Sequence, residues 1–383
     1  MSHANTVFSQ LLRLVSRHEF QRLANQHHEG QALRKISRWD QFVALLMAQL
    51  SGRQSLRDIE ANINAQTGSH YHLGVRRIAK SSLARVNEKQ PYSLYEALFE
   101  KLVSRCKGRS PLHRFRFKNP LYSLDSSMID LSLNIFPWAE HNRIKAGMKL
   151  HVGLDHGGYF PVFATVTDGK RHDVPIGRGF EFPPGSMVVM DKGYTDYGWY
   201  KQLTEKGIFF ITRQRANAKY RVVERREANR AQGITSDQVI ELTGLQFQDK
   251  ELPKLRRIGY RDADSGKHYV YLTNHFKLSA KTVAEVYKDR WQVELFFKAI
   301  KQNLKIQAFV GNSRNAVLTQ IWIALCTFLM LSYLKFLSRT GWSEQRILRL
   351  LQANLFSKKD LMTLIRPMPP PEQHQPSQML LWA

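Results

Sequence analysis

The chain has 383 residues, enough for two or three domains, and 43% of them are apolar, so it can bury a sizeable core. Its 57 Lys and Arg against 32 Asp and Glu give a formal net charge of +25. Such an excess repels itself unless a polyanion neutralises it, which indicates nucleic acid or an anionic membrane surface as partner. The two cysteines, Cys106 and Cys326, exclude a disulfide framework and a cysteine-based zinc site.

Of these two partners, the membrane is not supported by a signal peptide or by a clear membrane span. Met1 to Gln10 are polar and precede no long apolar run, so we expect no secretory signal peptide and a cytoplasmic location. The stretch from Val317 to Leu337 is apolar, but it carries Thr, Gln, Ser and Lys side chains and has no second span beside it. We therefore expect a buried helix over a sheet, and no membrane partner.

Residues 1–118 are predicted to be helical. A capped helix opening at Ser55, a break at Gly68 and a basic helix from Val75 to Val86 suit a helix-turn-helix that reads duplex DNA. A helical bundle with a solvated basic face is the alternative. Residues 105–118 are rich in Arg and Lys, which is typical of a linker that touches phosphate or of a solvated connector.

The pattern changes to strands at Leu121. Short apolar or alternating runs predict a mixed sheet with a helix at 197–205, and hence the α/β class; the predicted strands are 121–129, 148–154, 159–167, 186–190 and 208–212. Residues 213–280 are basic and contain further short strands, which indicates a β-rich insertion. One long amphipathic helix is predicted from Lys281 to Leu304, more helices from 316 to 365, and a disordered proline-rich tail after 367.

One side of that long helix is polar. Tyr287, Arg290, Glu294 and Lys301 fall within about 60° of one another when residues advance about 100° around the axis. The apolar residues occupy roughly the opposite side; they are Val286, Val293, Phe296, Phe297, Ile300 and Leu304. By itself the stripe fits a surface Arg–Glu pair as well as a site.

Two aspartates accompany strands that are otherwise apolar. Asp125 lies within Leu121 to Ser127, and Asp191 directly follows the apolar run Met187 to Met190. A carboxylate there is expensive to desolvate unless a cation pairs with it, although a lone strand-end Asp is more often a cap or a turn former. Asp173 is the rival for the second position, but it does not follow an apolar run. Three histidines do not have the regular spacing of a zinc site, and we expect turn and surface roles for them: His151, His156 and His172.

Together, Asp125, Asp191 and Glu294 offer hard oxygen ligands. Three carboxylates can hold two Mg²⁺ ions, which keep waters and phosphate oxygens as their other ligands. Two metal ions support attack on a phosphodiester, since one activates the nucleophile and the other stabilises the leaving oxygen. The carboxylates and the charge of the chain therefore predict a metal-dependent enzyme acting on DNA.

The run from Tyr287 to Lys301 fits the pattern Y-x2-R-x3-E-x6-K without a gap. It resembles the signature of DDE transposases of the insertion-sequence-four family of bacterial mobile elements. The segments Ser123-Leu124-Asp125-Ser126-Ser127 and Val189-Met190-Asp191-Lys192-Gly193-Tyr194 look like the first and second aspartate strands of that family. The resemblance covers roughly residues 40 to 340.

The resemblance implies a ribonuclease-H-like catalytic domain whose catalytic and metal-binding residues are Asp125, Asp191 and Glu294, with Tyr287, Arg290 and Lys301 on DNA phosphates. It implies two Mg²⁺ ions, with Mn²⁺ able to substitute. Water would cut at the transposon end, and the freed 3′-hydroxyl would attack target DNA. The partners would be double-stranded DNA, as inverted-repeat ends and as target, and a second copy of the chain in the synaptic complex. The location would be the nucleoid of a bacterium.

Relatives that form a DNA hairpin stack a flipped base on a tryptophan of the insertion, and residues 213–280 contain none. The hairpin step is therefore left open, with five other aromatic residues as substitutes: Tyr220, Phe247, Tyr260, Tyr269 and Tyr271. The expected domains are 1–118 (helical, DNA-binding), 119–212 plus 281–340 (catalytic), 213–280 (insertion) and 341–383 (helical, with the tail). Two other functions remain alternatives: a non-catalytic DNA-binding regulator on a degenerate nuclease scaffold, and a stand-alone structure-specific nuclease.

Overall fold

The computed structural model describes residues 5–142, 145–243, 252–304, 306 and 309–366. The predicted disorder of the tail and the candidate Phe247 lie outside the described residues. The N-terminal part is helical, as expected, and its α-helices are α1 (Val7–Leu12), α2 (Arg17–Gln26), α3 (Arg38–Ser51), α4 (Leu56–Ala65), α5 (His70–Leu73), α6 (Lys80–Lys89) and α7 (Ser93–Lys107). Ser37 and Asp40 form a reciprocal capping box that fixes the start of α3.

The expected helix-turn-helix is only partly present. Ser55 does cap α4 through the backbone N–H of Asp58, and α4 packs against α6. However, α6 begins at Lys80 rather than at residue 75, and a short 3-10 turn and α5 lie between the two helices. A helix-turn-helix has a turn of only about three or four residues, so this pair is not one. The linker predicted for residues 105–118 begins later than expected, because α7 continues to Lys107.

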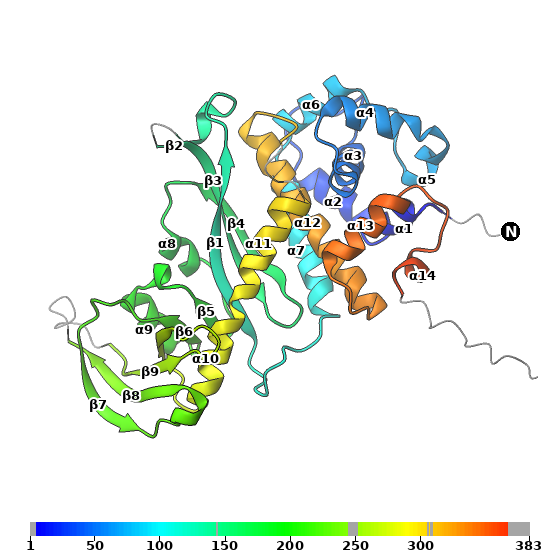
Figure 1. Ribbon diagram of the computed structural model, residues 1–383. Helices are drawn as coiled ribbons and strands as arrows, with labels where there is room; N and C mark the ends of the chain where they lie inside the picture. Colours follow the sequence, from blue (N-terminus) through cyan, green and yellow to red (C-terminus); the bar gives the residue numbers. More distant parts are fainter. Residues whose placement is uncertain (1–4, 143–144, 244–251, 305, 307–308, 367–383) are drawn as a thin grey trace, which may run out of the picture.

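One mixed sheet among the described residues runs from beside the N-terminal helices to the opposite end of the molecule (Figure 1). Its strands are β1 (Leu121–Leu131), β2 (Glu140–Asn142), β3 (Lys145–Asp155), β4 (Phe160–Asp168), β5 (Met187–Met190), β6 (Phe209–Arg213), β7 (Tyr220–Arg226), β8 (Ile234–Leu242), β9 (Leu255–Arg261) and β10 (His268–Thr273). The strand order among the described residues is β2-β3-β1-β5-β6-β10-β9-β8-β7, and β4 also pairs with β3. Strand β1 runs parallel to β5, which runs parallel to β6, whereas β3 and β4 run antiparallel to their neighbours.

The β-rich insertion is not a separate sheet. Strand β10 pairs antiparallel with β6, with Leu272 opposite Thr212, so β7 to β10 extend the central sheet at one edge (Figure 1). Helices α8 (Asp173–Arg178) and α9 (Tyr197–Glu205) follow β4 and β5 in the chain. The sheet therefore carries both the candidate aspartates and the insertion on one continuous hydrogen-bonded scaffold.

The predicted long helix is two helices, α10 (Ala280–Asp289) and α11 (Trp291–Asn303), which meet at Arg290. There the backbone N–H of Arg290 bonds to the carbonyl of Tyr287, three residues back, which tightens the turn. Helix α11 packs along β1, and the six apolar residues predicted for the inner side of the long helix are all buried. Its position over the strands fixes the distance between Glu294 and the sheet.

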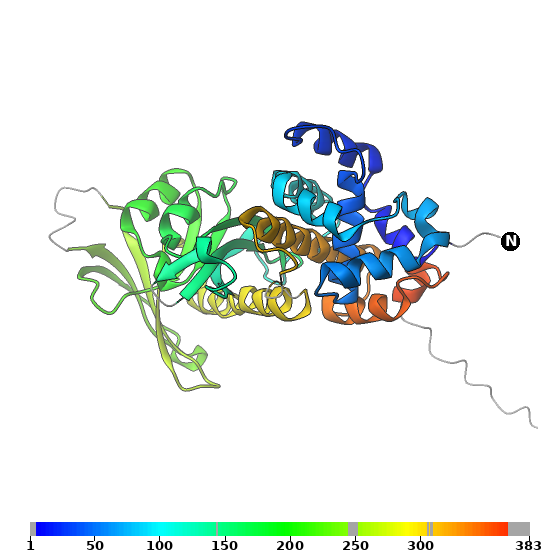
Figure 2. The same cartoon turned by 90° about the horizontal axis from the view of Figure 1, so that it is seen from above.

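The remaining helices are α12 (Arg314–Ser338), α13 (Glu344–Asn354) and α14 (Leu361–Ile365). Helix α12 is long and apolar enough to cross a membrane, yet 94% of its most apolar window is buried. It packs against α3, α6 and α7 as well as β4, so it is a core helix, as the sequence predicts. Figures 1 and 2 show α12 to α14, in orange and red, grouped with the N-terminal helices beside the sheet.

Candidate active site

Two of the predicted acids are positioned by neighbouring parallel strands: Asp125 lies on β1 and Asp191 directly follows β5. Leu124 of β1 pairs with Met190 of β5. Because the two strands are parallel, the residues that follow this pair, Asp125 and Asp191, lie next to each other. Adjacent strands lie about 4.8 Å apart. The apolar runs that carry the two acids are therefore what brings them together: both strands are central, and their buried residues hold the pair in register.

Arg290 joins the first acid to the third. Its Nη1 lies 2.7 Å from Oδ2 of Asp125, and its Nη2 lies 2.9 Å from Oε1 of Glu294. Arg290 is well positioned for this because the tight turn between α10 and α11 occurs at that residue, one helical turn before Glu294. The planar guanidinium thus holds two carboxylates from distant parts of the chain.

Asp191 has different partners. Its Oδ1 accepts a 2.8 Å bond from Arg213 at the end of β6 and lies 3.4 Å from the hydroxyl of Tyr287. Arg213 lies between Asp191 and the ring of Tyr287, with its guanidinium 5.9 Å from the ring centroid. In the sequence, Arg213 is only the first of the basic residues of the range 213–280. A basic residue at the end of the strand after the second aspartate was the available signal.

The two aspartates differ in electrostatic environment. Burial raises the pKa of Asp125, and the charge of Arg290 and the N–H of Ser126 offset that only in part. Burial also raises the pKa of Asp191, but the hydrogen bond and the charge of Arg213 outweigh this effect, so that the pKa of Asp191 is lowered. The charge of Asp191 raises the pKa of Asp125 and that of Arg290 favours both ionised forms, so the groups share one electrostatic site.

The donor set suits a hard divalent cation, because all three side chains are carboxylates and all three are partly exposed, at 20%, 31% and 37%. In this structure each of the three carboxylates forms an ion pair with an arginine. Within the described ranges, no group of three His, Cys, Asp or Glu side chains is placed to hold a metal ion. Binding a cation at these oxygens would require Arg290 to release at least one of them.

The predicted polar stripe is present only in part. Arg290 and Glu294 face the sheet site, but Tyr287 is 8% exposed and packs 4.8 Å from the ring of Tyr271. The phenol is therefore a buried support for Asp191 rather than a group on an open face. Lys301 lies two turns beyond Glu294, half-buried, and has no ion pair within the described part of the chain.

The expected turn and surface roles hold for two of the three histidines. His172 is exposed and His156 lies in the turn after β3, although it is buried, whereas His151 is buried on β3 itself. His151 Nδ1 lies 3.5 Å from Asp173, which also contacts Lys149 and the hydroxyl of Ser126 next to Asp125. Asp173 thus lies beside the first aspartate without replacing the second. Alternation along β3 puts His151 on the face of Lys149, opposite the apolar series that includes Leu150 and Val152, so the strand pattern gave no signal of its burial.

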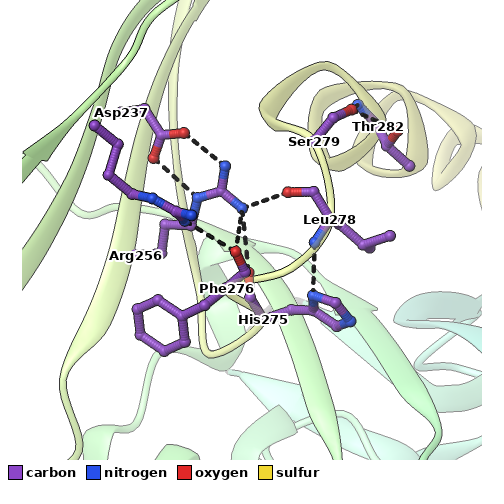
Figure 3. Close-up of polar contacts among 8 residues, drawn as sticks. Asp237, Arg256, His275, Phe276, Leu278, Ser279 and Thr282 are labelled. Atoms are coloured by element: carbon purple, nitrogen blue, oxygen red, sulfur yellow. Dashed lines mark hydrogen bonds and ion pairs between the residues drawn. The ribbon is translucent and has the colours of Figure 1, made fainter.

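A buried ion pair in the insertion supports the start of α10 (Figure 3). Arg256 of β9 bonds Asp237 of β8 through Nε and Nη2, at 2.9 and 2.6 Å. Its Nη1 lies within 3.4 Å of the carbonyls of His275 and Phe276 and also contacts that of Leu278. Ser279 then caps α10 through the N–H of Thr282. The insertion therefore anchors the segment from which the helix carrying Arg290 begins.

Asp125 within β1, Asp191 directly after the parallel strand β5, Glu294 on α11 and the strongly basic chain suit an enzyme that works on a phosphodiester backbone. A family model described as "Transposase DDE domain" matches residues 116–330, and a "Domain of unknown function (DUF4372)" matches residues 3–76. The chain belongs to the DDE transposase family. It is a DNA transposase, and enzymes of this family depend on divalent metal ions.

Individual relatives agree. The chain is 33% identical to "Putative transposase y4zB" of Sinorhizobium fredii over 76% of its own length and 82% of that protein. It is 27% identical to "Probable transposase for insertion sequence element IS5377" of Geobacillus stearothermophilus, over 87% and 86%. A solved piggyBac transposase synaptic complex with hairpin DNA aligns over 98% and 87% at 13% identity, with a TM-score of 0.43, too low to bear on the fold.

Proposed function

We propose that Asp125, Asp191 and Glu294 are the catalytic carboxylates of this transposase and hold two Mg²⁺ ions, with Mn²⁺ as a substitute. The observation that carries the proposal is that Arg290 bonds Asp125 of β1 and Glu294 of α11, and that its charge also acts on Asp191, which directly follows β5. Two such ions would supply the charge that activates an attacking hydroxyl and stabilises the leaving oxygen of a phosphodiester.

The side chains around these acids suit a DNA strand. An open cleft of about 560 Å³ adjoins Asp191 and is lined also by Lys192, Gln214 and Arg215. Arg290 can clamp a phosphate with two parallel N–H groups once it leaves a carboxylate, whereas Lys301 and Lys192 act as point charges. Tyr287 would act on the DNA through Asp191 and Arg213 rather than by a contact of its own, because it is buried.

The reaction we propose has two stages on this one site. Water attacks the phosphodiester at the inverted-repeat end of the element, and the freed 3′-hydroxyl then attacks target DNA. Two chains would pair two ends before cutting. The motif from Tyr287 to Lys301 supports assignment to the insertion-sequence-four family. A cytoplasmic, nucleoid-associated location belongs to the same proposal.

We infer a ribonuclease-H-like core from the order β4-β3-β1-β5-β6, in which β1, β5 and β6 are parallel. The proposed catalytic domain is 119–212 plus 281–340, with 213–280 as the insertion. Residues 1–118 are proposed to bind DNA, and 341–383 to form the C-terminal region. The insertion would contribute a basic surface on strand β7, where Arg221 and Arg225 are exposed.

Replacing Glu294 by Gln tests the proposal. Single-turnover cleavage in Mg²⁺ of a duplex carrying the element's terminal repeat should fall at least about 1000-fold, while binding of that duplex without metal stays within about threefold. The control is Glu285→Gln, an exposed glutamate of α10 that pairs with Lys281. Full cleavage by Glu294→Gln would contradict the catalytic role and favour a DNA-binding regulator. Cleavage without strand transfer in the wild type would favour a nuclease.

A further inference from the structure

A buried chain of hydrogen bonds joins β1 to the junction of α10 and α11. The hydroxyl of Ser123 lies 2.6 Å from Nε2 of His156, and Nδ1 of His156 lies 2.7 Å from Oδ2 of Asp289. Tyr159 donates to the same oxygen over 3.1 Å, and Arg114 Nη2 lies 2.8 Å from the other oxygen. Ser123, His156 and Asp289 are only 0%, 2% and 5% exposed.

This order of groups is that of a serine hydrolase triad, but it does not act as one here. A nucleophilic serine must meet its substrate, and Ser123 has no exposed surface. The carboxylate of Asp289 is nonetheless ionised: burial raises its pKa, and the hydrogen bond and charge of His156, with Arg114 and Tyr159, outweigh that and lower it. The chain of bonds is thus a fully paired buried network, which holds its members in one arrangement.

Its location relative to the acids is specific. Ser123 and Asp125 are two residues apart on β1, so their side chains leave the same face of the strand. Asp289 and Arg290 are consecutive at the helix junction. Asp289 reaches Ser123 through His156, and Arg290 reaches Asp125 directly. Two sets of hydrogen bonds therefore connect the junction of α10 and α11 to β1, one at Ser123 and one at Asp125.

We infer that Asp289 and His156 are positioning residues that set the register of α11 against β1 and so place Arg290 and Glu294 opposite Asp125. This inference rests on the catalytic roles proposed above for Asp125 and Glu294. The junction needs such a constraint because α10 ends and α11 begins there, and the N–H of Arg290 bonds the carbonyl three residues back instead of four, as at a hinge. With only the Arg290 bridge left, α11 can turn about that residue, and a misplacement of about 1 Å at a reacting centre costs about 100-fold in rate.

The test uses the full-length chain and the variants Asp289→Asn, His156→Gln and the double variant. Each is compared in metal-free binding of the terminal-repeat duplex, in single-turnover cleavage with Mg²⁺, and in the ¹⁹F spectrum of 5-fluorotryptophan at Trp291. Trp291 follows Arg290 directly and is 58% exposed, so its resonance reports on the junction without any catalysis. Asp40→Asn is the control, because Asp40 is as buried as Asp289 and also pairs with an arginine, Arg76, in the N-terminal helices.

We expect duplex binding within about threefold of wild type, cleavage reduced about 100-fold, and a shifted or broadened Trp291 resonance in each variant, with the double variant no worse than the worse single one. Asp40→Asn should leave the resonance in place. An unchanged resonance with unchanged cleavage would overturn the inference, and so would binding and cleavage that fall together in proportion to unfolding.

Ser123→Ala is the milder variant, should Asp289→Asn not fold. It removes one hydroxyl from the network, and we expect about tenfold slower cleavage with intact binding; cleavage at the wild-type rate would overturn the inference. If wild-type protein itself does not cleave, or if Glu294→Gln cleaves equally well, the proposed function fails, and the Trp291 resonance still decides whether the network sets the junction.

Discussion

Arg290 Nη1 lies 2.7 Å from the carboxylate of Asp125, although 165 positions separate the two residues in the chain. Both side chains are largely buried, at 12% and 20% exposure. Removing one member of such a pair leaves the other charge uncompensated, which costs more than the pair itself contributes. In this molecule the charge left behind belongs to a proposed metal ligand.

Replacing Arg290 by Gln should therefore lower the free energy of unfolding by about 2 kcal/mol, less than for a fully buried pair. Millimolar Mg²⁺ should restore part of that loss, because a cation can take over the neutralisation of Asp125. Urea unfolding with and without MgCl₂ measures both effects. Arg290→Lys is the control, since it retains the charge. Equal stabilisation of wild type and Arg290→Gln by Mg²⁺ would contradict the expectation.

His151 makes the stability of the fold depend on pH. Burial lowers its pKa from 6.5 to about 4; the carboxylate of Asp173 opposes this and the charge of Lys149 adds to it. Between those values the unfolded chain binds a proton that the folded chain does not, so stability is full above pH 6.5 and falls as the pH falls towards 4.

Relative to His151→Gln, the wild type should lose roughly 3 kcal/mol of its free energy of unfolding across that window. Denaturant unfolding at a series of pH values gives the two curves. His172→Gln serves as control, because His172 is exposed beside the same aspartate and should leave the pH dependence unchanged. Parallel curves for wild type and His151→Gln would refute the assignment.

The buried pair Asp237–Arg256 predicts a graded set of stabilities. Asp237→Asn should cost about 3 to 5 kcal/mol, because it leaves the guanidinium charged and unpaired at 4% exposure. The double variant Asp237→Leu with Arg256→Met should recover only part of this. Its apolar side chains replace the ion pair, but the carbonyls of His275, Phe276 and Leu278 lose their donor. Full recovery by thermal or urea unfolding would show that the carbonyl contacts contribute little.

Binding of the terminal-repeat duplex should weaken steeply with salt. For six to ten phosphate contacts the affinity falls about 10³-fold or more between 50 and 200 mM salt, because neutralised phosphates release their counterions. Arg225 is exposed on β7 and has no ion pair among the residues that the structure covers, so Arg225→Gln should reduce the slope of log affinity against log salt by about one. Arg349→Gln on α13 is the control. A flat salt response would count against the basic surface as the DNA site.

The sequence by itself determined the central strands and the buried side of the long helix. Apolar runs around Asp125 and before Asp191 predicted the two central strands, because a buried strand of a parallel pair is apolar throughout. The helical spacing from Tyr287 to Lys301 predicted which residues of α11 are buried and placed Arg290 and Glu294 on one side. These features depend only on residues near one another in the chain.

Only the tertiary structure decided how distant residues meet. It placed Arg290 between Asp125 and Glu294, joined β10 to β6 so that the insertion extends the sheet, and buried Tyr287, His151 and His156. It also divided the long helix at Arg290 and linked Asp289 to β1 through His156. Helical periodicity and strand patterns carry no information about partners more than about one turn away, and these contacts form only when the sheet and the helices pack.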